Sequence, residues 1–207
     1  LRTKGYRPAI ISRGYKRKSK GLIVVNHGEG TIVGVDVAGD EPYLMSTKLK
    51  NVPVVVCKKR EQATEYIVKN LDTINVILLD DGFQYRGLHR DIDIVLLNGK
   101  ECSDILREPK RSLKRADIVL SLNKQYEIHE FKDDKFISSK PNGSIYAFCG
   151  IAEPKSFLSF LKSENIDIQN HSIFEDHQEY SSQCIHELES SINESGVNSI
   201  ITTEKDL

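Results

Sequence analysis

The chain has 207 residues, of which 39% are hydrophobic and 29% are charged, and its formal net charge at pH 7 is −1. These proportions are typical of an ordinary soluble globular protein that forms one large or two small domains. The near-neutral charge argues against a nucleic-acid-binding module, and no stretch approaches the roughly eighteen apolar residues that a membrane-spanning helix requires.

Short apolar runs alternate along the chain with amphipathic stretches, which is the pattern of βα units. The apolar runs predict strands at 9–12, 53–57, 74–80, 92–97, 117–121, 144–149, 166–174 and 197–202. The stretches between them predict helices near 41–50, 59–71, 154–164 and 181–194. Strands and helices that alternate with short connections predict an α/β fold, in which helices cover both sides of a mostly parallel sheet.

Two segments interrupt this alternation. Residues 22–35 hold two apolar runs around a glycine-containing turn, which predicts a β-hairpin. Residues 123–143 are polar and rich in lysine and acidic residues, which predicts a loop or a weak helix. We place a domain boundary near residue 100, so that the predicted domains are 1–100 and 101–207.

Two adjacent carboxylates, Asp80 and Asp81, follow the apolar run 76–79 directly and precede Gly82. The carboxyl ends of parallel strands are where open α/β sheets bind ligands, and an acid there can hold Mg²⁺ against the phosphates of a nucleotide. The same residues also fit a strand that ends in a simple Asp-Gly turn. The pair alone supports the two readings about equally.

The loop after the first predicted strand, Ser12-Arg13-Gly14-Tyr15-Lys16-Arg17-Lys18, combines cations with an aromatic residue and a glycine. Its place at the carboxyl end of a strand suits an anionic substrate, because an arginine can contact two phosphate oxygens at once. A solvated basic loop explains the same composition, so the loop by itself does not establish a binding site.

Asp40 stands just before a predicted helix, in Gly39-Asp40-Glu41-Pro42, and is either a general base or a simple N-cap. An aspartate is a weak base at neutral pH, so the catalytic role requires a partner. His177 follows a predicted strand and is a candidate for that partner, since imidazole titrates near neutrality. The alternative for His177 is an ordinary surface histidine.

Arg107 and Glu108 precede Pro109 and form a further candidate pair. They fit a loop with a surface salt bridge. Alternatively, Arg107 contacts a substrate phosphate and Glu108 serves a metal or a hinge between domains.

The phosphate-binding sequence Gly-x-x-x-x-Gly-Lys-Ser/Thr does not occur in these residues. Residues 1–5 fit the end of the helix that would follow such a loop, and the chain stops soon after a predicted strand. We interpret the chain as an internal fragment of a longer protein, without the N-terminal strand and P-loop. We therefore expect the fragment alone to lack tight ATP binding and turnover.

Taken in order, these segments resemble the tetraacyldisaccharide 4′-kinase family, the lipid A 4′-kinases. The Asp-Asp-Gly-Phe-Gln run followed by Leu-Arg-Glu-Pro is the most specific part of the match, which spans nearly the whole chain. The matching segments are 12–15, 39–42, 79–84, 90–97, 106–109, 115–117, 174–177 and 202–206.

The resemblance implies a P-loop kinase of the α/β class with a second, smaller α/β lobe. It implies transfer of the γ-phosphate of ATP, with Mg²⁺, to the 4′-hydroxyl of a tetraacyldisaccharide 1-phosphate, which gives lipid IVA. It also implies that the protein acts at the cytoplasmic face of the inner membrane of Gram-negative bacteria. There the protein would be held by an N-terminal element that is absent from this fragment, which we expect to be soluble.

Carried over residue by residue, the resemblance makes Asp40 the catalytic base and His177 its dyad partner. It places Asp80, Asp81 and Gln84 beside the nucleotide, with the two aspartates near Mg²⁺. A base divided between two lobes would be assembled only when the lobes close, which would also exclude water.

The resemblance also makes Glu108 a metal-linked residue and makes Arg13, Tyr15 and Arg107 contacts to substrate or phosphate. One departure from the family lies at Tyr85, where the family usually has histidine. A phenol keeps a hydrogen-bonding group but does not titrate near neutral pH, which puts any proton-transfer role at that position in doubt.

Two other functions remain open at this point. A nucleotide-dependent switch ATPase of the same fold would use the acids for Mg²⁺ without a lipid acceptor. The third possibility is a non-catalytic module that begins at Leu1.

Overall fold

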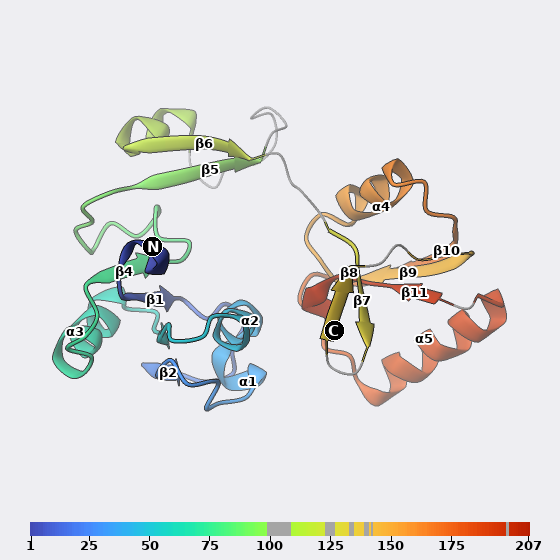
Figure 1. Ribbon diagram of the computed structural model, residues 1–207, viewed down its shortest axis with the longest axis horizontal. Coiled ribbons are helices and arrows are strands. Elements are labelled where there is room, and N and C mark those ends of the chain that lie inside the picture. Colours follow the sequence, from blue (N-terminus) through green and yellow to red (C-terminus); the bar gives the residue numbers. More distant parts are fainter. Residues whose placement is uncertain (99–108, 123–126, 133–134, 139–140, 142, 198) are drawn as a thin grey trace. The chain divides into compact units, whose positions relative to one another are not determined.

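The computed structural model describes residues 1–98, 109–122, 127–132, 135–138, 141, 143–197 and 199–207 (Figure 1). Its contacts group the chain into two compact units, Leu1–Lys124 and Gln125–Leu207. This division lies later in the chain than the boundary near residue 100 that the sequence suggests, because a pair of strands on either side of that point belongs to the first unit.

The first unit is built on a four-stranded sheet with the order β2-β3-β1-β4. Its strands are β1 (Pro8–Ser12), β2 (Ile23–Asn26), β3 (Val54–Val56) and β4 (Val76–Leu79). β1 pairs in parallel with both β3 and β4, whereas β2 is an antiparallel edge strand. The accompanying helices are η1 (Arg2–Lys4), α1 (Val35–Ala38), α2 (Asp40–Lys48) and α3 (Arg60–Asn70).

Apolar side chains fill both faces of this sheet, as expected for parallel strands that are covered on two sides. On one face, Ala9 and Ile11 of β1 pack with Ala63 and Ile67 of α3. On the other face, Ile10 of β1 belongs to a second cluster, which includes residues of β2, α1 and β3. The alternation along β1 therefore directs neighbouring side chains to opposite layers, and the predicted α/β architecture is confirmed.

The predicted hairpin at 22–35 is wrong in its second half. β2 pairs with β3, and Val25 of β2 is completely buried. The chain that returns after the turn forms a single β-bridge with β2, between Asn26 and Thr31. The segment then enters α1 instead of a second strand. The apolar run therefore marks a strand of the larger sheet, because pairing with β3 buries more apolar surface than an isolated hairpin could.

A parallel pair of strands, β5 (Ile94–Asn98) and β6 (Ile118–Leu122), completes the described part of the first unit, together with η2 (Lys110–Arg115). Among the described residues, neither β5 nor β6 pairs with the four-stranded sheet.

The second unit has a parallel three-stranded sheet with the order β10-β9-β11. Its elements are β9 (Ile145–Cys149), α4 (Pro154–Ser163), β10 (Ile168–Ile173), α5 (Ser182–Ser195), β11 (Ser199–Ile201) and η3 (Glu204–Asp206). Phe157 and Leu161 of α4 pack against Ile145 and Ala147 of β9 to form its core.

An antiparallel ribbon precedes this sheet, formed by β7 (His129–Lys132) and β8 (Lys135–Ser138). The expectation of a loop or weak helix over 123–143 is therefore wrong for these two strands, whose polar residues obscure the pattern of period two. No helix in the described ranges is both long enough and apolar enough to cross a membrane.

Candidate active site

The carboxyl ends of β1, β3 and β4 meet at one edge of the first sheet. Ser12 pairs with Val56 and Ile11 with Leu79, so the three strands end side by side. The Asp80 amide donates to the Ile11 carbonyl at 2.9 Å, which continues the pairing of β1 and β4 by one residue. The loops that follow the strands therefore bring their polar residues to the same edge, where open α/β sheets bind ligands.

Asp80 is held in place by a buried hydroxyl. Ser12 is 3% exposed, and its Oγ donates to Oδ2 of Asp80 at 2.8 Å. The same Oγ accepts a bond of 3.4 Å from the Gly14 amide, so a single serine connects the acid with the loop that carries Arg13. A carboxylate oriented in this way is prepared for a ligand before the ligand arrives.

A sharp turn follows the two acids. Asp81 is exposed and has a φ of 49°, in the left-handed region that non-glycine residues seldom adopt. At Gly82 an added Cβ would lie 2.6 Å from Cβ of Leu79, so only glycine fits there. The two acids therefore lie at the strand end and also form part of an Asp-Gly turn, so the two interpretations of this segment are compatible.

Asp40 is the first residue of α2 and adjoins the loop that contains Arg13 and Tyr15. At Gly14, where φ is 66°, an added Cβ would lie 2.9 Å from the Ala38 carbonyl; at Gly39 it would lie 3.1 Å from the Tyr15 carbonyl. The two backbones touch because both positions are glycine. The N-cap of α2 is Gly39 and makes no side-chain capping bond, so the interpretation of Asp40 as a simple N-cap is wrong.

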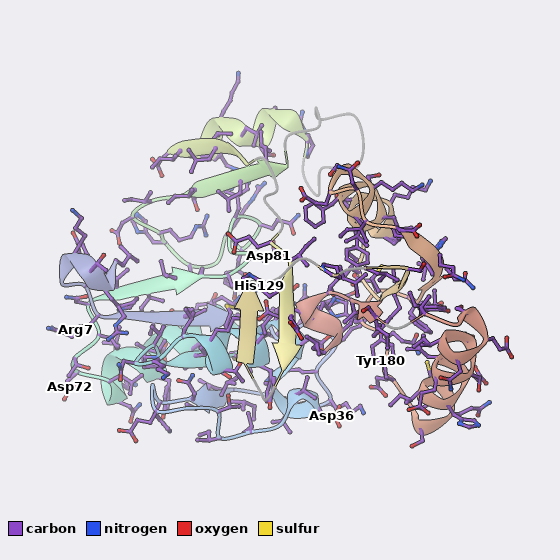
Figure 2. All side chains as sticks on the ribbon, turned by 45° about the vertical axis from the view of Figure 1, so that its right-hand side comes forward. Arg7, Asp36, Asp72, Asp81, His129 and Tyr180 are labelled. Carbon is purple, nitrogen blue, oxygen red and sulfur yellow. The ribbon has the colours of Figure 1, made fainter. Side chains whose placement is uncertain are left out.

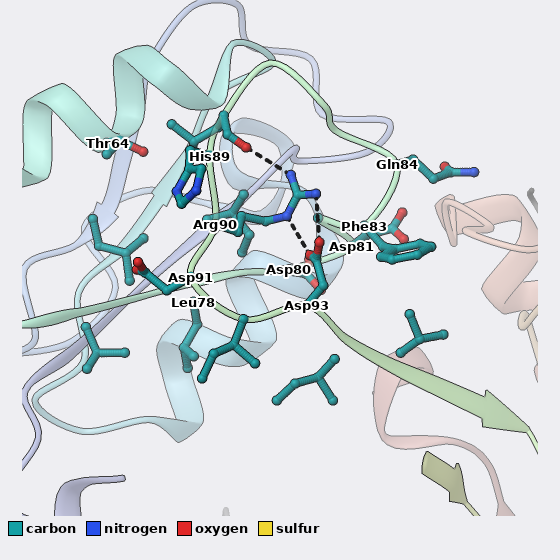
Figure 3. A pocket seen from close by; sticks show the side chains of 18 of the residues that line it. Thr64, Leu78, Asp80, Asp81, Phe83, Gln84, His89, Arg90, Asp91 and Asp93 are labelled. Atoms are coloured by element: carbon teal, nitrogen blue, oxygen red, sulfur yellow. Dashed lines mark hydrogen bonds and ion pairs between the residues drawn. The ribbon is translucent and has the colours of Figure 1, made fainter. Parts of the chain in front are cut away.

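Asp80, Asp81 and Gln84 also line a cavity of about 1410 Å³, which is bordered by β4, α3, η2 and β5 (Figure 3). Much of its remaining lining is apolar and accessible to solvent, with Leu78 41% and Leu96 55% exposed. The acids thus stand where the polar edge of the sheet meets an open apolar surface.

The loop between the acids and β5 is fastened by an ion pair. The Arg90 guanidinium contacts both carboxylate oxygens of Asp93, at 2.5 and 3.0 Å (Figure 3). This pair raises the pKa of Arg90. The Asp93 amide donates in turn to Asp117 at 2.7 Å. These residues, which the resemblance includes in matching segments, therefore serve the architecture of the loop.

Arg60, at the start of α3, is a further candidate site residue that the sequence did not predict. It follows the carboxyl end of β3, and its side chain is almost fully buried beside Tyr85. Its sequence signal was its place in the first turn of a helix that follows a parallel strand, where anions often bind.

His177 lies at the corresponding edge of the second unit. Its φ is 62°, and its amide donates to the Gly150 carbonyl at 3.3 Å, just after β9. The His177 side chain is only 10% exposed, and its Nε2 lies 3.6 Å from Oδ2 of Asp176. Lys205 holds the other oxygen of Asp176 at 2.8 Å. The histidine is thus a fixed residue of a strand-end loop, in contrast to the alternative of an ordinary surface residue.

The predicted site residues fall into three groups. Arg13, Tyr15, Asp40, Asp80, Asp81 and Gln84 belong to the first unit, and His177 belongs to the second. Arg107 and Glu108 lie outside the described residues. The described residues contain no group of three or more His, Cys, Asp or Glu side chains that could hold a metal ion, and the expected metal set includes Glu108.

The family model for tetraacyldisaccharide-1-P 4′-kinase, LpxK, matches residues 1–207. The chain belongs to this family. It is 33% identical to the tetraacyldisaccharide 4′-kinase of Desulfotalea psychrophila and covers 69% of that protein with 98% of its own length. It is 34% identical to the kinase of Pelodictyon phaeoclathratiforme, of which it covers 68%.

A solved structure of the LpxK family supports the same fold. The crystal structure of LpxK from Aquifex aeolicus in complex with ATP matches 99% of the chain with a TM-score of 0.71 and 31% identity, and the chain covers 70% of it. The expected resemblance to the lipid A 4′-kinases is therefore confirmed over the whole chain, including both units.

Proposed function

We propose that the protein transfers the γ-phosphate of ATP to the 4′-hydroxyl of a tetraacyldisaccharide 1-phosphate. The observation that carries this proposal is the strand edge of the first unit, where Ser12 orients Asp80 and two touching glycines bring Asp40 to the neighbouring loop. Membership of the LpxK family and the ATP complex of a related kinase support the choice of substrates.

Asp40 is the residue that we assign as general base. It would accept the proton of the 4′-hydroxyl as the oxygen attacks the phosphoryl group, which is the one proton transfer that this reaction requires. His177 would share that proton from the second unit. The fixed place of His177 beside Asp176 supports such a role, because a partner for proton transfer must have a defined position.

Asp80 and Asp81 have the chemistry to hold Mg²⁺. Carboxylate oxygens are the ligands that this hard cation prefers, and one oxygen of Asp80 is already oriented by Ser12. Bound there with ATP, Mg²⁺ would neutralise charge on the phosphates. Gln84 lines the same cavity and would contact the nucleotide, while Arg13 and Tyr15, both exposed, would meet the acceptor or its phosphate.

The acceptor determines where such an enzyme works. A tetraacylated disaccharide resides in a membrane, so we propose that the protein acts as a peripheral enzyme at the cytoplasmic face of the bacterial inner membrane. The open apolar cavity beside the acids supports a location near lipid, since exposed apolar surfaces often mark sites of interaction.

The test is phosphate transfer from γ-labelled ATP to the disaccharide 1-phosphate in mixed micelles, with full-length protein. We expect Asp40→Asn to lower kcat by about 10²–10⁴-fold with little change in ATP affinity. Asp36→Asn, the same change at an exposed residue four positions earlier, should stay within about twofold of wild type.

Two results would contradict the proposal at different levels. If the Asp40→Asn enzyme kept full turnover, the assignment of Asp40 as the general base would be wrong. ATP hydrolysis by the wild type that neither needs nor phosphorylates the disaccharide would instead indicate a switch ATPase.

A further inference from the structure

Arg60 is a buried cation with an unused hydrogen-bond donor. Its side chain is the first of α3, and the residue is 4% exposed. Its Nε is buried and has no hydrogen-bond partner in the part of the chain that the structure describes. A buried N–H of a charged group that is left unpaired is costly, so such groups occur rarely without a functional reason.

Tyr85 holds the Arg60 guanidinium in a defined position. The guanidinium carbon lies 5.1 Å from the centre of the Tyr85 ring, within range of a cation–π interaction, and Nη1 donates to the Lys58 carbonyl at 3.1 Å. The Tyr85 hydroxyl donates to Oε2 of Glu61 at 2.5 Å, which fixes the ring. At Gly87 a Cβ would lie 2.6 Å from Oε1 of Glu61, so the chain leaves room for this acid.

The hydrogen bond to Glu61 is the main cause that raises the pKa of the Tyr85 phenol above its usual value. The phenol is therefore protonated around neutral pH and acts as a donor to Glu61. A role in proton transfer, which histidine at this position would permit, is replaced by a structural one: Tyr85 supports Arg60.

The surroundings of Arg60 favour a bound anion. α3 has eleven residues and begins just after the carboxyl end of β3, where the positive end of the helix dipole favours an anion. Burial and, second, the nearby Arg13 charge lower the pKa of Arg60. Arg13 itself is exposed and has no ion pair within the described ranges. Among the described residues no acid is bonded to either cation, and the Arg13 charge is near enough to affect Arg60.

A purely structural arginine in the same unit looks different. Arg90 has both sides of its fork occupied by the Asp93 carboxylate. Asp81 and Asp80 raise the pKa of Arg60 by less than burial and the Arg13 charge lower it, and Asp80 is already bonded to Ser12. The arginine therefore remains available to a ligand that carries its own negative charge.

We propose that Arg60 binds a phosphoryl group at this edge, with Tyr85 as its positioning residue. The ligand class is a polyphosphate, and in the proposed kinase reaction it is the phosphate chain of the nucleotide. This inference rests on the proposed function for the identity of the ligand only, because the site itself is defined by the contacts of Arg60.

Binding of sodium tripolyphosphate to the full chain tests the proposal without a lipid or turnover. The readouts are the affinity and the ¹⁵N–¹H resonance of Arg60 Nε. We expect this resonance to shift on addition of the probe, and Arg60→Lys to weaken binding by about tenfold or more, because lysine lacks the fork. Lys59→Gln, which removes an exposed neighbouring charge, should change the affinity by about twofold or less.

The role of Tyr85 is tested by Tyr85→Phe and Tyr85→Leu. Phenylalanine keeps the ring and should retain most of the affinity, whereas leucine removes the cation–π contact and should weaken binding by about three- to tenfold.

The proposal would be overturned if the Arg60 resonance of the wild-type protein did not shift on addition of tripolyphosphate. Equal losses of tripolyphosphate affinity in Arg60→Lys and Lys59→Gln would overturn it as well. The wild-type resonance decides the question even if a variant is unstable. A site that binds tripolyphosphate in a protein that fails to phosphorylate the disaccharide would contradict the proposed function and leave the anion site standing.

Discussion

The carboxylate of Asp206 accepts a hydrogen bond of 2.9 Å from the hydroxyl of Tyr180, a residue 26 positions earlier in the chain. Figure 2 labels Tyr180 among the side chains of the second unit. The same carboxylate accepts bonds from the Gly150 amide at 3.0 Å and from Thr203 Oγ1 at 2.5 Å. Because Gly150 follows β9 and its carbonyl accepts the His177 amide, Asp206 joins the loop after β11 to the loop that carries the proposed dyad histidine.

We expect Asp206→Ala to destabilise the second unit by about 2–4 kcal/mol, because three partners lose their acceptor in a partly buried site. Urea unfolding followed by circular dichroism measures the loss. Asp167→Ala is the matched control, since that exposed acid accepts a single bond of 3.3 Å from Ser144, and it should cost less than about 1 kcal/mol. Equal losses in the two variants would show that the Asp206 contacts do not stabilise the fold.

The same network predicts that the protein loses stability in alkali. Burial and the hydrogen bond to Asp206 raise the pKa of Tyr180, and burial and the Asp206 charge raise the pKa of Cys149. In an unfolded chain, thiols and phenols ionise near pH ~8.5 and ~10. Folding stability from these groups is therefore fully present below pH ~8.5 and decreases as the pH rises above it, because only the unfolded state releases the protons.

Urea midpoints measured between pH 7 and pH 10.5 check this dependence. We expect a progressive decrease above pH ~8.5 that becomes shallower in the double variant Tyr180→Phe with Cys149→Ala. A midpoint that stays constant over the range, or a slope unchanged in the double variant, would contradict the assignment.

Close contact between two backbones predicts a large effect of a single methyl group. Gly14→Ala places a Cβ 2.9 Å from the Ala38 carbonyl at a φ of 66°, so strain and collision add. Gly21→Ala has a similar φ of 73° but open space around it. We expect the first change to cost about 3 kcal/mol or more and the second about 1–2 kcal/mol by thermal unfolding. The difference between them measures the close approach that positions Asp40, and its absence would show that the loops separate readily.

The periodic features of the sequence were sufficient to predict the regular elements. All eight strands expected from apolar runs are present, as are four helices at the expected places, because burial in a parallel sheet leaves continuous apolar runs such as 76–79. The error at 22–35 arose because pairing of β2 with β3 is a long-range choice that local pattern does not record. The ribbon at 129–138 was missed because its residues are mostly polar.

The site could be predicted from the sequence only for residues that directly follow the ends of predicted strands. Asp80, Asp81 and Arg13 follow strands directly, and their convergence follows from parallel pairing. The Ser12–Asp80, Tyr85–Glu61 and Tyr180–Asp206 bonds join residues that are 24 or more positions apart, and the first joins residues 68 positions apart. Such pairs depend on side-chain packing, for which a single sequence gives no periodic signal.

The apolar lining of the cavity between β4 and β5 predicts that the chain binds hydrophobic dyes. Leu96 on β5 is 55% exposed and lines this cavity, whereas Ile32 is 58% exposed and does not. We expect Leu96→Glu to reduce the fluorescence enhancement of anilinonaphthalene sulfonate and Ile32→Glu to leave it unchanged. Equal fluorescence from Leu96→Glu and the wild type would place the dye elsewhere.

The Ser12–Asp80 bond predicts a specific loss of metal binding. In Ser12→Ala the carboxylate of Asp80 loses its buried donor, and we expect Mn²⁺, used as a paramagnetic substitute for Mg²⁺, to bind to the full-length protein about 5–30-fold more weakly in the presence of ATP. Ser19→Ala is the matched control, since its Oγ donates at 2.6 Å to the Val37 carbonyl, accepts a bond of 3.1 Å from Arg17, and is bonded to no acid among the described residues. Titration of Mn²⁺ by electron paramagnetic resonance measures both variants. A weaker site in Ser12→Ala together with an unchanged site in Ser19→Ala would show that the hydroxyl acts through Asp80, because a general loss of packing would affect both.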